Sequence, residues 1–319
     1  MTSKRHTLLL LLLLATPLMA ANAIGVRGKI GPQGKPKRVQ RLQIRKSGVY
    51  ENYLVDGKFA GGNRVKITAN NVTVRHCEIR NCSGNGIGVF GKNVLIENCR
   101  IHHMLAGTFK KQRDAHGIAG RWNNVTIRNC EIYYVSGDCI QFDPDRRSSG
   151  KVVIDNCSLW TGPLPSDTVG FRKGQRPGEN AFDSKTPKRG PRCQLVMRRC
   201  VLKGWRQPGQ ISLVAALNIK ENVDAKVEQC LFIDNQVCFR LRGPTRRGAA
   251  KVTIKQCAIF DSRIGLRVED KLRDLKVSKL GFNGKVRRKY HFVGRGPFPG
   301  YENKDETKVD SYEKLLKQG

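Results

Sequence analysis

The chain has 319 residues and a formal net charge of +33, which arises from 59 lysines and arginines against 26 aspartates and glutamates. This excess of positive charge concentrates polyanions at the protein surface. Beyond residue 23 no stretch is long and apolar enough to cross a bilayer, which excludes a transmembrane segment in the mature chain.

Residues 1–23 predict a secretory signal peptide. Lys4 and Arg5 precede an unbroken run of leucines at 8–14, and the small residues of 21–23 offer a cleavage site. We therefore expect a secreted or periplasmic protein. The polyanions available to it are uronate or sulfated polysaccharides, extracellular nucleic acid and anionic cell surfaces, and we expect an acidic polysaccharide as the partner.

One motif recurs along most of the chain. It begins with two apolar residues separated by one residue of any type, followed by two polar residues and a cysteine. One further residue of any type and an apolar residue end it. A tolerant period above 20 residues, built from β-forming residues that alternate in polarity, predicts a parallel β-helix. The motif reads VTVRHCEI at 72–79, VLIENCRI at 94–101, VTIRNCEI at 125–132, VVIDNCSL at 152–159, LVMRRCVL at 195–202, KVEQCLF at 226–232 and VTIKQCAI at 252–259.

The 11 cysteines of an exported protein suggest disulfides at first sight. Seven of them occupy the same position of the repeat, where they would stack inside the solenoid as small hydrophobic groups. We therefore favour free buried thiols, and the absence of matched histidines argues against a metal site at these cysteines.

A second strand lies upstream of each cysteine strand, as in GIGVF at 86–90, CIQFD at 139–143 and AFDSK at 181–185. Its second and fourth residues should face the core, and its third and fifth should face solvent. The third positions are Gly88, Ala119, Gln141, Asp183, Asn218, Arg240 and Arg267, and the fifth positions are Phe90, Arg121, Asp143, Lys185, Lys220, Arg242 and Glu269.

These outward positions change in character along the stack, from small residues through carboxylates and amides to arginines. Asp138, Asp143 and Asp145 surround one strand, and Glu179 and Asp183 lie at the next. Four or five oxygen donors within two rungs suit a hard cation such as calcium, so we expect a Ca²⁺ site. The alternative is an ordinary cross-strand ion pair of Asp143 and Lys185, worth about 0.2–1 kcal/mol.

The rungs, the asparagine-cysteine strands and the signal peptide resemble secreted right-handed parallel β-helix proteins of the pectate-lyase-like superfamily, over roughly residues 50 to 282. The resemblance implies an all-β fold, a single-stranded right-handed parallel β-helix (solenoid) of about eight rungs. We place it at 24–286, with a basic tail at 287–319 that could cap one end. The resemblance further implies calcium at Asp138, Asp143 and Asp145, with Lys185 as catalytic base.

The function we expect is that of a polysaccharide lyase, which cleaves an acidic glycan by β-elimination. His116 is an alternative base or acid, unless it is a hydrogen-bonded turn histidine. Substrate would be bound by Arg121, Gln141, Arg172, Arg189, Asn218, Lys220, Arg240 and Arg242, and the metal ligands would include Asp183.

Two other functions stay open. A hydrolase of the same fold would need clustered carboxylates, for which Asp138, Asp143 and Asp183 could serve. A non-catalytic β-helix could bind anionic polysaccharide or cell-envelope polymers through its basic face. Nucleic acid is not expected as a partner, because no recognised binding motif or aromatic stacking platform is evident.

Overall fold

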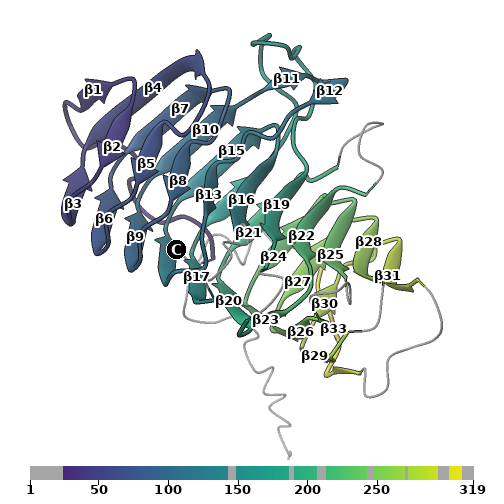
Figure 1. Ribbon diagram of the computed structural model, residues 1–319. Coiled ribbons are helices and arrows are strands. Elements are labelled where there is room, and N and C mark those ends of the chain that lie inside the picture. Colours follow the sequence, from purple (N-terminus) through teal and green to yellow (C-terminus); the bar gives the residue numbers. More distant parts are fainter. Residues whose placement is uncertain are drawn as a thin grey trace, which may run out of the picture.

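The computed structural model describes residues 24–142, 149–186, 190–206, 213–242, 248–269, 272–293 and 302–310. These residues form three long parallel sheets that together make an elongated coil (Figure 1). The predicted signal peptide, 1–23, lies outside the described residues. Within the described ranges we find no helix with the length and apolarity needed to span a bilayer.

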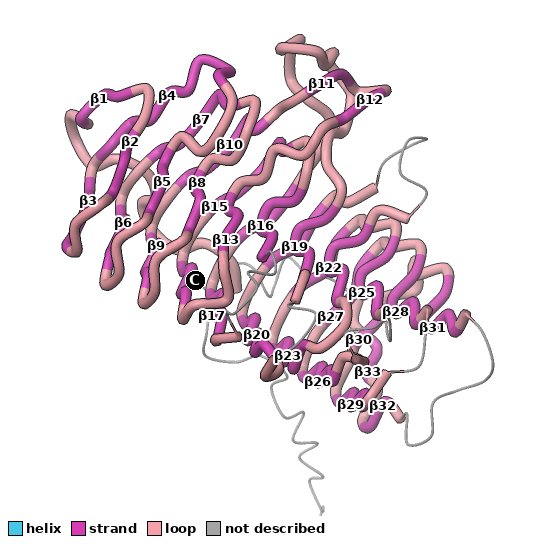
Figure 2. The backbone as a smooth tube through the Cα atoms, in the orientation of Figure 1, coloured by secondary structure: helices cyan, strands magenta, loops and turns pink. Residues whose placement is uncertain are grey.

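Each turn of the coil passes through the three sheets in the same order, which we name B, C and A (Figure 2). Sheet B carries the second strands of the repeat. Its members are β2 (Leu42–Ile44), β5 (Val65–Ile67), β8 (Ile87–Val89), β13 (Ile118–Gly120), β16 (Asp138–Phe142), β19 (Asn180–Ser184), β22 (Ala215–Ile219), β25 (Val237–Leu241), β28 (Ile264–Val268) and β31 (Arg288–Phe292).

Sheets C and A divide the cysteine motif between them. Sheet C contains β3 (Gly48–Glu51), β6 (Val72–Arg75), β9 (Val94–Glu97), β14 (Val125–Arg128), β17 (Lys151–Asp155), β20 (Cys193–Arg198), β23 (Val223–Glu228), β26 (Lys251–Lys255), β29 (Asp274–Ser278) and β32 (Asn303–Lys304). Sheet A contains β1 (Lys37–Val39), β4 (Tyr53–Ala60), β7 (Glu78–Cys82), β10 (Arg100–Met104), β15 (Glu131–Val135), β18 (Ser158–Trp160), β21 (Val201–Lys203), β24 (Leu231–Ile233), β27 (Ala258–Phe260), β30 (Gly281–Phe282) and β33 (Thr307–Lys308). A short antiparallel hairpin, β11 (Gly107–Thr108) and β12 (Lys111–Gln112), stands apart from them.

The cysteine motif is therefore a corner between two strands, whereas the sequence suggested one continuous strand. The residue before each of the seven repeated cysteines has a left-handed backbone, with φ of 51° at His76, 53° at Asn98 and 50° at Asn129. Asparagine tolerates this conformation better than most residues, which explains its frequency there. Asn129 Nδ2 also donates to Asn98 Oδ1 at 2.6 Å, so the corners of successive rungs are bonded to one another.

All 11 cysteines are free and buried, which confirms the prediction of unpaired thiols. The thiol of Cys99 donates to the carbonyl of Glu97 at 3.2 Å, and that of Cys130 donates to Arg128 at the same distance. The repeated cysteine thus fills the inside of a corner and satisfies a nearby backbone carbonyl.

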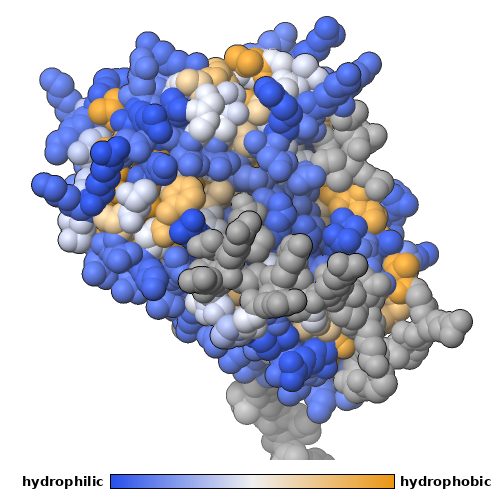
Figure 3. All heavy atoms as spheres, in the orientation of Figure 1, coloured by the Kyte–Doolittle hydropathy of each residue, from blue (hydrophilic) through white to orange (hydrophobic). Residues whose placement is uncertain are grey.

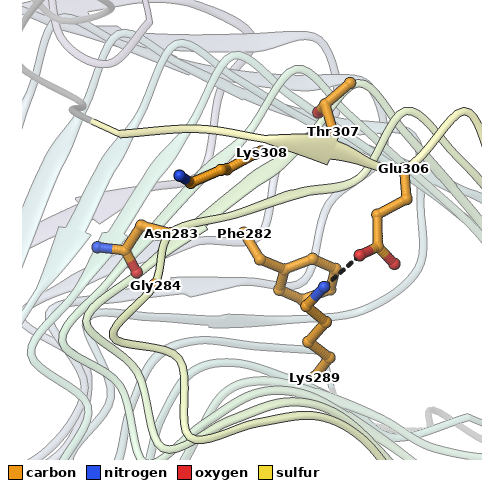
Figure 4. A pocket seen from close by; sticks show the side chains of 7 residues that line it. All are labelled: Phe282, Asn283, Gly284, Lys289, Glu306, Thr307 and Lys308. Carbon is orange, nitrogen blue, oxygen red and sulfur yellow. Dashed lines mark hydrogen bonds and ion pairs between the residues drawn. The ribbon is translucent and has the colours of Figure 1, made fainter.

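The parallel β-helix that the sequence predicts is confirmed, and the described residues contribute eleven, ten and ten strands to its three sheets. This is roughly the expected eight rungs, and the additional strands lie at the two ends. The last strands fall within 287–319 and pair in register with the sheets, as Leu266 does with Tyr290. Glu306 connects the strands of this end, because it pairs with Lys289 (Figure 4). It also accepts a hydrogen bond from Tyr290 Oη at 2.8 Å.

Substitutions at Asn98 test the corner. Asn98→Gly keeps the left-handed backbone and loses the hydrogen bond, so it should reduce the free energy of unfolding by about 1 kcal/mol. Asn98→Val should reduce it by about 1–2 kcal/mol more, because a side chain branched at Cβ fits this conformation poorly. Urea unfolding followed by circular dichroism measures both. Equal losses in the two variants would contradict the role of the backbone conformation.

Candidate functional site

The outer side of sheet B carries the column of residues that the sequence predicts. Gln141 stands opposite Asp183, Asp183 opposite Asn218, and Asn218 opposite Arg240. The register therefore confirms that these residues, from four separate turns, share one face. On the side of the molecule seen in Figure 3, hydrophilic side chains cover most of the described surface, with small apolar patches between them.

The middle of this column is buried, although the sequence analysis expected it to face solvent. Gln141, Asp183 and Asn218 are 2%, 3% and 4% exposed. Longer side chains fold over them: Lys185 Nζ donates to Gln141 Oε1 at 3.1 Å, and Lys220 Nζ lies 2.7 Å from Asp183 Oδ2. The side chains of the column point away from the core, but the neighbouring lysines cover them. The polar groups of the column are therefore shielded from water.

His116 adds a ring to this cluster from the turn before β13. The backbone N–H of Asp138 donates to its Nδ1 at 2.9 Å, so in the neutral ring Nε2 carries the proton. Nε2 lies 3.3 Å from Nε2 of Gln141. His116 therefore presents a donor to the cluster, which makes it a poor proton acceptor in this tautomer.

Asp138 is a buried carboxyl with an unusual environment. Its Oδ1 accepts a hydrogen bond from Asn180 Nδ2 at 2.7 Å, whereas its Oδ2 is buried without a hydrogen bond from any described residue, 3.5 Å from Nδ1 of His116. Burial raises the pKa of Asp138 well above its ordinary value, and the charges of Asp183 and Glu179 raise it further. Since Nδ1 is already an acceptor, a protonated Oδ2 fits this position better than an ionised one.

Glu179 completes a group of three acidic side chains. Burial raises its pKa, and Asp114 and Asp183 raise it further, while Lys220 and Lys185 lower it. Asp183 pairs with Lys220, so ionised and protonated carboxyl groups can coexist within two rungs. Acid–base chemistry requires neighbouring groups with different pKa values, so that one is protonated while another is ionised.

The described residues do not by themselves supply the expected calcium site. Within the described ranges, no three His, Cys, Asp or Glu side chains are arranged to hold a metal ion. Asp138 is bonded to Asn180, and Asp183 to Lys220, so both would have to exchange partners to bind calcium. The other two predicted ligands, Asp143 and Asp145, lie outside the described residues.

The predicted substrate-binding residues are only partly brought together. Arg121 lies over the ring of Phe90 at 5.3 Å, and Arg240 and Arg242 pair with Glu269 at the later rungs. Arg172 is exposed on the loop before β19, where its backbone N–H donates to Gln175. Arg189 lies outside the described residues.

Two features of the structure, one on sheet B and one on sheet A, escaped the sequence analysis. Asn180 binds Asp138, which could have been inferred only from the pairing of β16 with β19. On sheet A, the rings of Tyr133 and Trp160 stack with centroids 4.3 Å apart, and His102 stacks on Tyr133 at 4.9 Å. An aromatic column thus exists where the sequence showed none, because its members come from three different turns.

Replacing Asp138 with asparagine tests its protonation. A carboxyl that keeps its proton in the folded chain, and loses it in the unfolded chain above about pH 4, lowers the free energy of unfolding as pH rises toward the raised pKa. Asp138→Asn should therefore melt at a higher temperature than the parent at pH 7, and this difference should shrink toward pH 4. Each unit by which the pKa is raised corresponds to about 1.4 kcal/mol.

Thermal denaturation across this pH range measures the effect. Asp274→Asn, at a half-exposed ion pair on sheet C, is the matched control and should change little. A lower melting temperature for Asp138→Asn at pH 7 would mean that the carboxylate is ionised and favourably bonded.

A comparison with protein families supports the architecture. The family model described as the right handed beta helix region matches residues 63–279. Among solved structures, the chain is similar to pectate lyase Pel9A, with 13% sequence identity, a TM-score of 0.49, and coverage of 79% of this chain and 69% of that one.

A second similar structure is the tailspike protein gp49 from Acinetobacter baumannii bacteriophage Fri1, a capsular polysaccharide depolymerase. Its sequence identity is 13%, its TM-score is 0.38, and the match covers 82% of this chain and 49% of the tailspike chain, about half of its length. A comparison with curated proteins finds no match.

Proposed function

The chain belongs to the family of the right handed beta helix region, and from this premise we propose that it is a secreted carbohydrate-active enzyme. Its substrate would be an acidic polysaccharide, and its reaction β-elimination. The observation that carries the proposal is the amine of Lys185 at hydrogen-bond distance from the buried amide of Gln141, among ionisable groups on one face of a basic solenoid. Perturbed ionisable groups gathered in one place are typical of functional sites.

The reaction would need one base and a positive environment. The base removes the proton from C5 of a uronate residue, the electron pair left on C5 forms the double bond to C4, and the C4–O bond breaks. The leaving oxygen then takes up a proton. Because negative charge grows beside an existing carboxylate, nearby cations stabilise the transition state most. Lys220 and Arg240 lie on the next two turns of the same face.

Lys185 is the proposed base, and its amine contacts the amide of Gln141. A lysine can accept a proton only as the neutral amine. In the present orientation Nε2 of Gln141 faces Nε2 of His116, so two N–H donors lie 3.3 Å apart. Turning the amide of Gln141 over would let its oxygen accept from His116 and would point its N–H at Lys185.

His116 takes a positioning role in this scheme. Its ring is held by the backbone N–H of Asp138, and if the amide of Gln141 is turned over, its Nε2–H would donate to the oxygen of the amide that touches Lys185. Glu179, whose pKa is raised, is available to return a proton to the leaving oxygen.

A hydrolase is the second candidate, and the raised pKa values of Asp138 and Glu179 beside Asp183 favour it. Hydrolysis would use one carboxyl as acid and another as base for water. The products separate the two reactions, because elimination leaves an unsaturated sugar that absorbs ultraviolet light and hydrolysis does not. Binding without turnover on every glycan would instead favour a non-catalytic protein that binds anionic polymers.

Substitutions at Lys185 test the proposed base. Loss of a general base costs about 10²–10⁴-fold in turnover, so Lys185→Ala should reduce kcat on a polyuronate by this factor. Lys185→Arg should lose as much, because arginine keeps the charge and does not release its proton at neutral pH. Ultraviolet absorbance of the unsaturated product measures both, with Lys226→Ala, exposed on sheet C, as the control. An active Lys185→Arg would show that the residue acts as a cation only.

We propose that Ca²⁺ is bound by Asp138, Asp143, Asp145 and Asp183, with Asp138 and Asp183 exchanging their present partners to bind it. On this proposal a chelator lowers both the melting temperature and the turnover, and added calcium restores them. Unchanged melting and turnover after chelation would remove calcium from the protein.

A further inference from the structure

The outer column of sheet B continues beyond the candidate site into rungs dominated by arginine. Arg240 stands opposite Arg267, and Arg267 opposite His291. Neighbouring strands lie about 4.8 Å apart, so Arg267, three strands beyond Asp183, is about 14 Å away along the column. A polymer lying along the face at Lys185 would therefore reach these rungs.

Three of these arginines share a single carboxylate. Glu269 lies 2.9 Å from Nε of Arg240, 3.2 Å from Nε of Arg242 and 2.8 Å from Nε of Arg267. Burial opposes ionisation of Glu269, but the hydrogen bonds from Arg240 and Arg267 hold its pKa below the ordinary value. One ionised carboxylate neutralises only one of three charges, so the cluster remains positive.

Beside this cluster lies a hollow of about 420 Å³, at the beginning of β25, β28 and β31. Its basic lining residues are Arg263, Arg267, Arg287, Arg288 and His291. Arg263, Arg287 and Arg288 are exposed, and in the described part of the chain no carboxylate lies within 4.0 Å of their guanidinium groups. The adjacent Lys289, in contrast, pairs with Glu306 and does not line this hollow (Figure 4).

His291 adds a further donor. Nη1 of Arg267 lies 3.1 Å from its Nδ1, and since a guanidinium can only donate, Nδ1 accepts and Nε2 keeps the proton. Partial burial and the charges of Arg267 and Arg288 lower the pKa of His291, which agrees with a neutral ring. The titratable side chains around the hollow thus present hydrogen-bond donors.

We propose that this hollow binds a sulfate or phosphate ester group carried by the acidic glycan, an inference that rests on the proposed function for the nature of the polymer. Such a group offers three free oxygens in a tetrahedral arrangement, each able to accept more than one hydrogen bond. Guanidinium groups match it in geometry and charge. A uronate carboxylate has two oxygens and is satisfied by one bidentate arginine, so the surplus of donors favours the ester.

The test compares two triple variants of the full-length protein. Arg263→Ala, Arg287→Ala and Arg288→Ala together remove three exposed positive charges from the hollow. Lys151→Ala, Lys226→Ala and Lys255→Ala remove three from sheet C and leave the same net charge. Calorimetric titration at about 150 mM salt would use three oligosaccharides of equal length: a sulfated one, a phosphorylated one and an unsubstituted oligouronate.

The arginine variant should bind the sulfated or the phosphorylated oligosaccharide about tenfold more weakly or worse, and the control variant should lose less than about twofold. The ligand that loses affinity identifies the ester. Equal losses in the two variants would show non-specific attraction and overturn the proposal, as would an equal loss on the oligouronate. Turnover by Lys185→Ala is scored separately, so failure of the proposed reaction leaves this result readable.

Discussion

The register of the stacked turns is the constraint on which the rest of the molecule depends. Because the strands are parallel and pair residue for residue, each position of the repeat generates a column whose members are one strand spacing apart. A column that faces inward must be uniform, and apolar residues and cysteine fill it. A column that faces outward is free to vary, so polar and charged side chains can occupy it without disturbing the core.

The same spacing creates a problem wherever charged residues are neighbours in a column, because like charges would then stand side by side. Residues of the adjacent column and of the turns pair with these side chains and compensate their charges. Lys220 pairs with Asp183, Lys185 binds Gln141, and Glu269 is shared among arginines. These contacts bury the middle of the column. This compensation is incomplete at Asp138, because one of its carboxyl oxygens has no hydrogen bond from the described residues.

The sequence predicted the coil and its columns, because both follow from a periodic pattern that needs no knowledge of contacts. It did not predict the corner at the cysteine motif, since a left-handed residue such as Asn98 leaves the alternation of apolar residues unchanged. Nor did it predict that Gln141 and Asp183 would be covered. Burial of an outward residue depends on the rotamers of lysines in other turns, and sequence spacing contains no information about them. The bond from Asn180 to Asp138 was missed for the same reason.

On the proposed function, a solenoid allows ligand binding and reaction to lie apart on one face. The carboxyl-rich turns at β16 and β19 and the arginine-rich turns at β28 and β31 belong to a single rigid sheet, so the distance between them is fixed by the number of intervening strands. A ligand long enough to cover both would be held at one end by charge while its other end lies over Lys185. Binding energy gained at the arginines would then position the reacting sugar over Lys185.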